Sequence, residues 1–348
     1  MARTPSPRTK GSAEQEDGVS DQGYKNVNAQ VADRPLITMA DLERYAEKLK
    51  NWGRWGDDDE IGTLNFVTPE MVAGAAQLVT KGQRFSLGLP YDQNGPQTGG
   101  LGRINPIHFM RRSGVDGAAG LRDKFGIRGA DDWILMPLQS STHWDALSHV
   151  FYRDHMYNGY PITDVSSDGA KRCGIEKARD RFAGRGVLLD VARFLGVEVL
   201  ENGFPITNDL LDKVAAAQKV EVRRGDFLIV RTGLVESKLK AGSWGDYAGG
   251  DAPGLAFETA EWLHAKEVAA VAIDTWGCEV RPNNSPGIYQ PWHWIVIPIM
   301  GLTMGENFYL KDIADDCAAD KRYEFFFVAP TLIITGSVSG PINPMAFK

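Results

Sequence analysis

The residues of this chain that could carry out chemistry are concentrated in one short segment. Three of the six histidines fall between residues 143 and 155, and residues 142–149 read THWDALSH. His143 and Asp145 are two positions apart, so on an extended strand their side chains share one face. An imidazole and a carboxylate on one strand face, followed closely by the imidazole of His149, indicate the nucleus of a divalent metal site.

The alternative interpretation of this segment is a group of polar residues in a surface loop. Its apolar neighbours, Trp144, Ala146 and Leu147, favour burial instead. Because a buried carboxylate or imidazole needs a partner, burial favours the metal interpretation. The pattern H-x-D-x-x-x-H is only moderately specific by itself.

A second pair of candidate ligands lies far downstream. His293 stands between two tryptophans in the apolar run PWHWIVIP, residues 291–298, and Glu306 follows a glycine-rich turn. Taken alone, this pair is more typical of a core histidine with satisfied hydrogen bonds and a glutamate at the start of a helix. Imidazole and carboxylate are nevertheless both ligands that divalent metals accept.

Together these separated blocks resemble the cyclase family of metal-dependent hydrolases, which includes bacterial kynurenine formamidase and isatin hydrolase. That family carries an early H-x-x-x-H-x-D-x-x-x-H motif, and later a separated His followed by a Glu. Two intervening stretches, GDFLIVRTG at residues 225–233 and AIDT at residues 272–275, are also similar to the family. Several blocks in the same order are more specific than any one of them, and the resemblance spans about residues 50–340.

The resemblance implies a role for each matching residue. His143 and Asp145 would be metal ligands, and His293 and Glu306 would complete the metal centre. Gln139 stands where the family often has a ligand histidine, and an amide oxygen is a weaker ligand for zinc than an imidazole. A single Zn²⁺ or Mn²⁺ ion is therefore expected at least as much as a pair of ions, with no organic cofactor.

The expected reaction follows from these groups. A bound divalent ion polarises a scissile carbonyl and lowers the pKa of a water to about 7, so that the water can attack an amide, lactam or lactone. His149, implied by the resemblance to transfer the proton, has an ordinary pKa of about 6.5. No serine or cysteine nucleophile is required, and Cys173 and Cys278 are expected to be buried small residues.

Aromatic residues near the candidate ligands suggest the kind of substrate. Trp55, Trp144 and Trp292 are predicted to line a flat pocket for a small aromatic or cyclic molecule, although most of the nine tryptophans are expected to be packing residues. Arg231 or Arg281 could pair with a substrate carboxylate, and each could equally be a structural ion-pair partner.

Two other functions are open. The His-x-Asp pattern with a distant His also fits the two-histidine, one-carboxylate face of a non-haem iron oxidoreductase, which gives no role to His149 or Glu306. The second is a binding protein that kept the fold and lost the chemistry, and the glutamine at position 139 keeps that hypothesis open.

The order of predicted elements indicates an α/β fold, with one domain over residues 37–348 after a flexible tail at residues 1–36. The resemblance implies a mixed, strongly curved sheet flanked by helices. Predicted helices and strands alternate along much of the chain. The helices are expected at residues 38–50, 69–80, 174–183, 207–218 and 257–266, the strands at 186–191, 226–231 and 268–273, and a β-rich end at 323–338.

Composition restricts the partners. The net charge of −7 gives no global attraction for nucleic acid. No signal peptide or membrane span is predicted, and three widely separated cysteines fit the cytoplasm. Residues 91–132 and 236–256 look like insertions that make the chain longer than the compact formamidases. The glycine-rich stretch 91–132 and the apolar C-terminal strands suggest a homodimer or homotetramer. The expected substrate is a small molecule.

Overall fold

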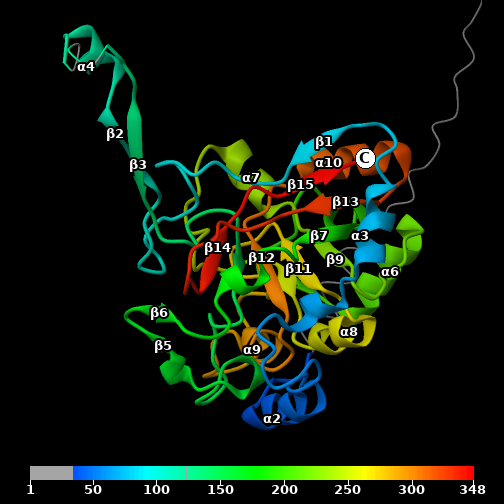
Figure 1. The fold of residues 1–348 in the computed structure, drawn as a ribbon. Coiled ribbons are helices and arrows are strands. Elements are labelled where there is room, and N and C mark those ends of the chain that lie inside the picture. Colours follow the sequence, from blue (N-terminus) through cyan, green and yellow to red (C-terminus); the bar gives the residue numbers. More distant parts are fainter. Residues whose placement is uncertain (1–33, 122–123, 125) are drawn as a thin grey trace, which may run out of the picture.

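A computed structural model describes residues 34–121, 124 and 126–348, and its centre is a single nine-stranded sheet (Figure 1). Four neighbouring strands in the middle are parallel, and the strands at both ends are antiparallel. The order is β1 (Arg84–Ser86), β15 (Met345–Phe347), β13 (Glu324–Val328), β7 (Ala183–Asp190), β9 (Phe227–Arg231), β11 (Ala270–Ile273), β12 (Thr303–Glu306), β4 (His143–Asp145) and β14 (Ser339–Pro341). The predicted mixed sheet is confirmed.

The central parallel strands are buried on both faces, which explains their unbroken apolar sequences. Alternate residues of β9 enter two different hydrophobic clusters: Leu228 and Val230 belong to one, and Phe227 and Ile229 to the other. One cluster is completed by helices including α2 and α9, and the other by α10 and the outer strands. The sheet therefore has a core on each face.

Helices cover the sheet, and three of them begin where the sequence predicts. Thr38, Thr68 and Thr207 each accept a hydrogen bond from the first turn of the helix that follows. The helices of the body are α2 (Met39–Lys48), α3 (Pro69–Ala76), α5 (Val191–Phe194), α6 (Asn208–Gln218), α7 (Leu234–Ala241), α8 (Thr259–Lys266), α9 (Pro291–Val296) and α10 (Lys311–Asp320).

Two predicted segments differ from the structure. The helix expected at residues 174–183 is wrong: only the short 3-10 turn η5 (Ile175–Ala178) forms, and β7 already begins at Ala183. The reason is that residues 183–187 pair with β13, so the sheet extends further back than the apolar run indicates. In the β-rich end predicted at 323–338, only β13 is a strand, and turns follow it.

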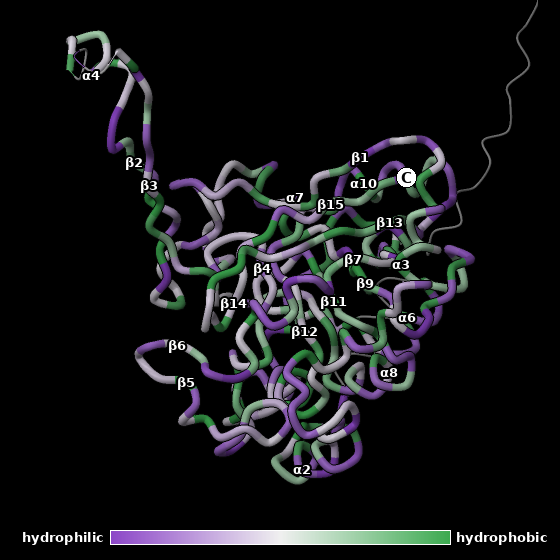
Figure 2. Tube along the Cα trace, viewed as in Figure 1, coloured by the Kyte–Doolittle hydropathy of each residue, from purple (hydrophilic) through white to green (hydrophobic). Residues whose placement is uncertain are grey.

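The glycine-rich stretch contains regular structure that the sequence pattern did not reveal. Strands β2 (Ile107–Arg112) and β3 (Asp131–Leu135) form an antiparallel hairpin, with the short helix α4 (Gly114–Ala118) near its tip. The hairpin, called the arm from here on, projects away from the body (Figure 1). A hydrophobic stretch lies where β3 returns to the body (Figure 2).

The predicted N-terminal tail lies outside the described residues except for residues 34–36. These three are held on the body, because Arg34 pairs with Glu258 and the side-chain amide of Asn284 donates to the carbonyls of Arg34 and Pro35. Residues 34–36 are thus part of the folded body. Within the described residues, no helix is both long and apolar enough to cross a membrane.

Candidate metal centre

The candidate ligands meet where β4 lies next to β12. Glu306 is paired directly with His143 in this antiparallel ladder, and Asp145 lies on the same face of β4 as His143. The His143 Nε2 atom is 3.4 Å from Asp145 Oδ1 and 3.4 Å from Glu306 Oε2. One ligand atom from each of these three buried residues lies within 4.8 Å of the others.

Two further histidines approach this cluster from separate elements. His293, on α9, places Nε2 at 3.6 Å from Glu306 Oε1. His149, in the turn after β4, places Nε2 at 3.8 Å from Asp145 Oδ1. The His149 side chain is 23% exposed, whereas His293 is 5% exposed, so His149 is the most open member of the group. The structure thus brings together five of the residues singled out in the sequence.

Two orphaned atoms test whether these residues fit a metal ion. His143 Nε2 and Asp145 Oδ1 are buried and have no hydrogen-bond partner in the described part of the chain. The other ring nitrogen of His143, Nδ1, lies 2.8 Å from the carbonyl oxygen of Ser141, which leaves Nε2 free to act as a ligand. Because buried polar atoms are rarely left unsatisfied, this donor set fits a divalent cation.

The charges of the cluster favour the same interpretation. Burial alone would raise the pKa of the Asp145 carboxyl, but His149 and His143 beside it lower that pKa below its usual range. Burial lowers the pKa of the His293 imidazole, but hydrogen bonds to Glu279 and Glu306 outweigh it and raise that pKa to about 10. Without metal, protons on His143 and His293, whose pKa values are both raised, therefore balance the carboxylates, and a bound cation would displace them.

His149 differs from His293 in its electrostatic surroundings. Burial lowers the pKa of the His149 imidazole, the neighbouring Asp145 opposes that effect, and the cation of Arg103 adds to it. The net shift is downward, so His149 is neutral at pH 7. A neutral, partly exposed imidazole can accept a proton from a molecule beside it.

Glu279 belongs to the centre although sequence reasoning missed it. Its buried carboxylate accepts a short hydrogen bond from His293 Nδ1 and others from the backbone N–H groups of Trp292 and His293. No periodic spacing links Glu279 with His293, so no local pattern could have revealed the contact. A glutamate within the run WGCEV, between buried neighbours, was the one available signal.

Gln139 lies four positions before His143, in the turn that leads into β4. It is half-buried, and its backbone carbonyl accepts a hydrogen bond of 3.2 Å from Gln97 Nε2. Its role as a metal ligand stays a prediction.

The predicted tryptophan pocket is wrong for two of its three members. Trp144 is completely buried, donates from Nε1 to the carbonyl of Ala329 and stacks on Phe182. Residues alternate between the faces of a strand, so Trp144 must point away from the face that carries its two neighbours. Trp292 is also completely buried and bonds to Thr259.

The third tryptophan has a different environment. Trp55 is half-buried, packs edge-on against Phe66 and lies under the guanidinium of Arg54. These contacts are those of a packing residue, and its role in substrate binding stays a prediction.

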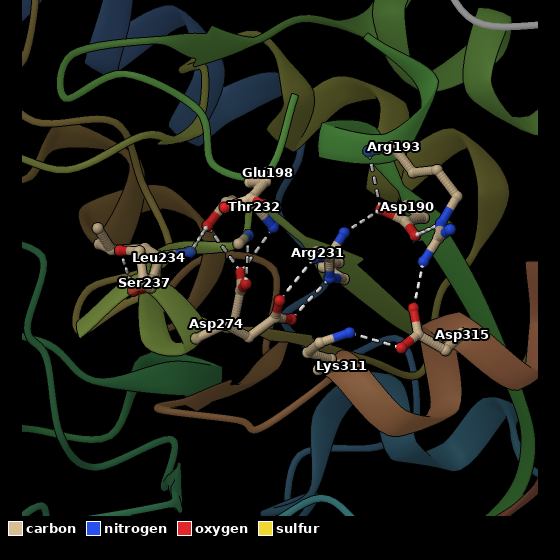
Figure 3. Close-up of polar contacts among 12 residues, drawn as sticks. Asp190, Arg193, Glu198, Arg231, Thr232, Leu234, Ser237, Asp274, Lys311 and Asp315 are labelled. Atoms are coloured by element: carbon tan, nitrogen blue, oxygen red, sulfur yellow. Dashed lines mark hydrogen bonds and ion pairs between the residues drawn. The ribbon is translucent and has the colours of Figure 1, made fainter. Parts of the chain in front are cut away.

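The two candidate arginines have different partners. Arg231 is buried and pairs with Asp190 and Glu236, so it is a structural residue (Figure 3). Arg281 lies over the ring of Tyr289 and donates to Asn283, with no carboxylate within 4.0 Å among the described residues. Arg281 therefore remains available to a ligand.

The cysteines have the environment expected of inert residues. Cys173, Cys278 and Cys317 are all buried and free. Burial raises the pKa of each thiol, which keeps it protonated and a poor nucleophile. The prediction that Cys173 and Cys278 are buried is confirmed.

Comparison with known proteins identifies the family. The model of the Cyclase family matches residues 76–280. A crystal structure described as a novel cyclase is 41% identical, covers 86% of this chain and 100% of its own, and superimposes with a TM-score of 0.79. The chain belongs to the cyclase family.

More distant structures share the fold. An isatin hydrolase bound to the product analogue thioisatinate is 15% identical, with 80% of this chain and 98% of that chain covered and a TM-score of 0.57. Isatin hydrolase A from Ralstonia solanacearum is 15% identical over 80% of this chain and 97% of its own, with a TM-score of 0.58. No curated protein matches this chain.

Proposed function

We propose that this chain is a metal-dependent hydrolase that cleaves the C–N or C–O bond of an amide, lactam or lactone. The observation that carries the proposal is the buried cluster of His143, Asp145 and Glu306, in which two ligand atoms have no other partner among the described residues. A divalent ion at this place would supply a Lewis acid and a water made acidic enough to ionise near neutral pH. The metal would be Zn²⁺ or Mn²⁺, because both accept nitrogen and oxygen ligands.

The residues of the chain would have two roles, metal binding and proton transfer. His143, Asp145, Glu306 and His293 would hold the ion in a site of which every member is at least 95% buried. Burial excludes competing water and keeps the charges of the site effective, because the local dielectric constant is low. The candidate ligands are therefore shielded from bulk solvent, and the site is accessible to solvent on the side of His149.

His149 is the residue we assign to proton transfer. Its pKa is lowered, so the ring is neutral at pH 7 and can accept a proton. When the leaving group departs, the same imidazole can return that proton to its nitrogen or oxygen.

A small cyclic or aromatic substrate is the class we propose. Structures that carry the name isatin hydrolase are among the relatives, and one of them is bound to the product analogue thioisatinate. The tryptophans no longer support this choice, since two of them are core residues. The substrate class thus depends on the relatives and on the hydrolytic chemistry.

The two other functions receive less support. An iron oxidoreductase with a two-histidine, one-carboxylate face has no use for Glu306, which lies 3.4 Å from His143. A binding protein without chemistry has no need of buried ligand atoms left without partners. Both alternatives give different results in the same assay.

The assay starts from protein stripped of metal with a chelator and then reloaded with Zn²⁺, Mn²⁺ or Fe²⁺. Each form is given formyl anilides, cyclic imides, isatin-like lactams and lactones, and both product formation and oxygen uptake are followed. Hydrolysis that appears only after Zn²⁺ or Mn²⁺ is added supports the proposal. Oxygen uptake with Fe²⁺, or full folding and no turnover with any metal, would contradict it.

We also propose that the chain assembles with copies of itself through the arm. Phe109, Met110, Trp133 and Leu135 on the two strands are between 44% and 62% exposed. A two-stranded hairpin is at best marginally stable alone, and an exposed apolar patch of this kind usually marks an interface. A dimer or tetramer would cover these side chains.

The cytoplasm is the location we propose. All three cysteines are free, although an oxidising compartment favours pairing of thiols. Three free thiols support this proposal.

A further inference from the structure

Glu279 is a buried carboxylate with four donors directed at it. The backbone N–H groups of Trp292 and His293 donate to Oε2 and Oε1 at 3.3 and 3.2 Å, and the side-chain amide of Asn283 donates to Oε2 at 2.7 Å. The fourth donor is the ring nitrogen Nδ1 of His293, which makes a short contact with Oε1. Glu279 itself is 2% exposed, so water does not compete for these bonds.

Two of these donors belong to the first turn of α9. The first N–H groups of a helix have no partner inside the helix, and the N-cap residue Gln290 gives α9 no side-chain cap. The Glu279 carboxylate, from the start of the loop before α9, supplies that cap instead. It therefore fixes the position of α9 and the orientation of the His293 ring with one side chain.

The contact at Nδ1 determines what the other ring nitrogen can do. A carboxylate accepts hydrogen bonds only, so in the neutral imidazole that binds a metal the one proton must be on Nδ1. The lone pair of Nε2 then faces Glu306, whose Oε1 is 3.6 Å away. His143 shows the same arrangement, since its Nδ1 lies against the Ser141 carbonyl and its Nε2 faces the cluster.

We infer that Glu279 is a positioning residue that sets the tautomer and the direction of His293 for metal binding. The inference rests on the proposed function, because it needs a metal at the cluster. Outer carboxylates of this kind make a ligand imidazole more basic and fix its ring, and their loss typically lowers metal affinity by about 10–100-fold. Glu279 does so without touching the ion or the substrate.

A second residue holds Glu279 in turn. Asn283 donates to Glu279 Oε2, while its own oxygen accepts from Arg281 Nη1 and from the backbone N–H of Gln290. The loop between Glu279 and α9 is thus tied together by one amide side chain. Removing that amide should loosen the carboxylate without removing it.

The experiment compares Glu279→Gln with wild type in the full chain. Gln has the same size as Glu, but one of the two acceptor oxygens is replaced by an NH₂ group. That NH₂ group would face N–H donors that a carboxylate oxygen accepts in wild type. Metal-free protein is titrated with Zn²⁺, and separately with Mn²⁺, against a chromogenic chelator that competes for the ion. We expect the variant to bind 10–100-fold more weakly than wild type.

Asp274→Asn is the matched control. Asp274 is also a completely buried carboxylate and accepts hydrogen bonds from Thr232 and Gly233, but it contacts none of the candidate ligands (Figure 3). Its variant should lose thermal stability and keep wild-type metal affinity. A loss of affinity in Glu279→Gln alone then reports on the site and not on a general loosening of the fold.

The tautomer is read directly by nitrogen NMR. The chain has six histidines, so selective ¹⁵N-histidine labelling gives few signals to assign. Zn²⁺-loaded wild type should show His293 with a proton on Nδ1, and Glu279→Gln should show that signal weakened or exchanging. If Glu279→Gln does not fold, Asn283→Ala replaces it, with a smaller loss of affinity in the same direction.

The outcomes separate the inference from the proposed function. Wild-type affinity in Glu279→Gln, or in Asn283→Ala if that variant replaces it, would overturn the positioning role and leave the hydrolase proposal standing. A wild-type protein that binds neither Zn²⁺ nor Mn²⁺ would overturn both. An equal loss of affinity in Asp274→Asn would also reject a specific role for Glu279.

Discussion

Glu306 lies directly opposite His143 in the pairing of β12 with β4, and their side chains approach to 3.4 Å. The two residues come from opposite halves of the chain, so the sheet itself builds the centre. A shift of this register by one residue would turn His143 and Asp145 to the far face of the sheet. The buried Trp144, packed on that far face, opposes the shift.

His143→Ala should lower metal content and turnover together. The change removes a ligand nitrogen and leaves two buried carboxylates, Asp145 and Glu306, without a cation between them. Metal analysis by mass spectrometry and a hydrolysis assay on the same preparation check this. His264→Ala, on α8, is the control and should keep both. Full metal content in the His143 variant would remove this residue from the centre.

His149→Ala should keep metal and lose turnover. Loss of a general acid–base group typically costs a factor of ~10²–10⁴. The pKa of this imidazole is lowered from its ordinary value of about 6.5, so the fall of the wild-type rate, which marks the ring gaining a proton, should lie on the acid side of pH 6.5. The His149 variant should lack that acid limb. Metal loss equal to that of His143→Ala would instead make His149 a ligand.

The sequence predicted the local parts of this centre better than its long-range parts. Parity along β4 placed His143 and Asp145 on one face, which the structure confirms. The same parity should have excluded Trp144 from the site, since a residue between two ligands on a strand points the other way. The meeting of His293 with Glu306 came from the family resemblance, because no spacing rule links a helix start to a strand end.

In the fold, too, local features could be predicted and long-range contacts could not. Threonine caps at positions 38, 68 and 207 set helix starts through contacts within one turn, so they were predictable. The helix expected at residues 174–183 failed because the pairing of β7 with β13, a long-range contact, decides where that strand begins. The Glu279 cap on α9 was missed because the capping side chain lies 13 to 14 positions before the N–H groups that it accepts from, outside any local capping pattern.

Lys348→Met should destabilise the protein in a pH-dependent way. The Lys348 ammonium is buried and bonds to Asp320 at 2.8 Å and to Asp316 at 2.7 Å. Burial raises the pKa of the Asp320 carboxyl, but hydrogen bonds to Lys348 and Lys81 outweigh it and lower that pKa to about 2. Loss of a hydrogen-bonded charge of this kind typically costs about 1.5–3 kcal/mol.

The sign of the pH dependence follows from the direction of that shift. A carboxyl whose folded pKa is lowered contributes stability above its unfolded pKa of about 4 and loses it as the pH falls toward 2. Denaturant unfolding of wild type and Lys348→Met should therefore differ most near pH 7 and converge below pH ~4. A difference that stays constant down to pH 2 would contradict the ion-pair explanation.

The arm gives the last prediction, which concerns assembly. The rings of Phe109 and Trp133 contact each other at a centroid distance of 5.7 Å, and both remain about half exposed. If a second copy covers this pair, Phe109→Glu with Trp133→Glu should place charges in the interface and shift the protein to monomers. Leu239→Glu is the control, because this exposed apolar residue lies on α7, outside the arm. Light scattering at micromolar concentration measures both variants. A wild type that is already monomeric, or an arm variant of unchanged mass, would contradict assembly through the arm.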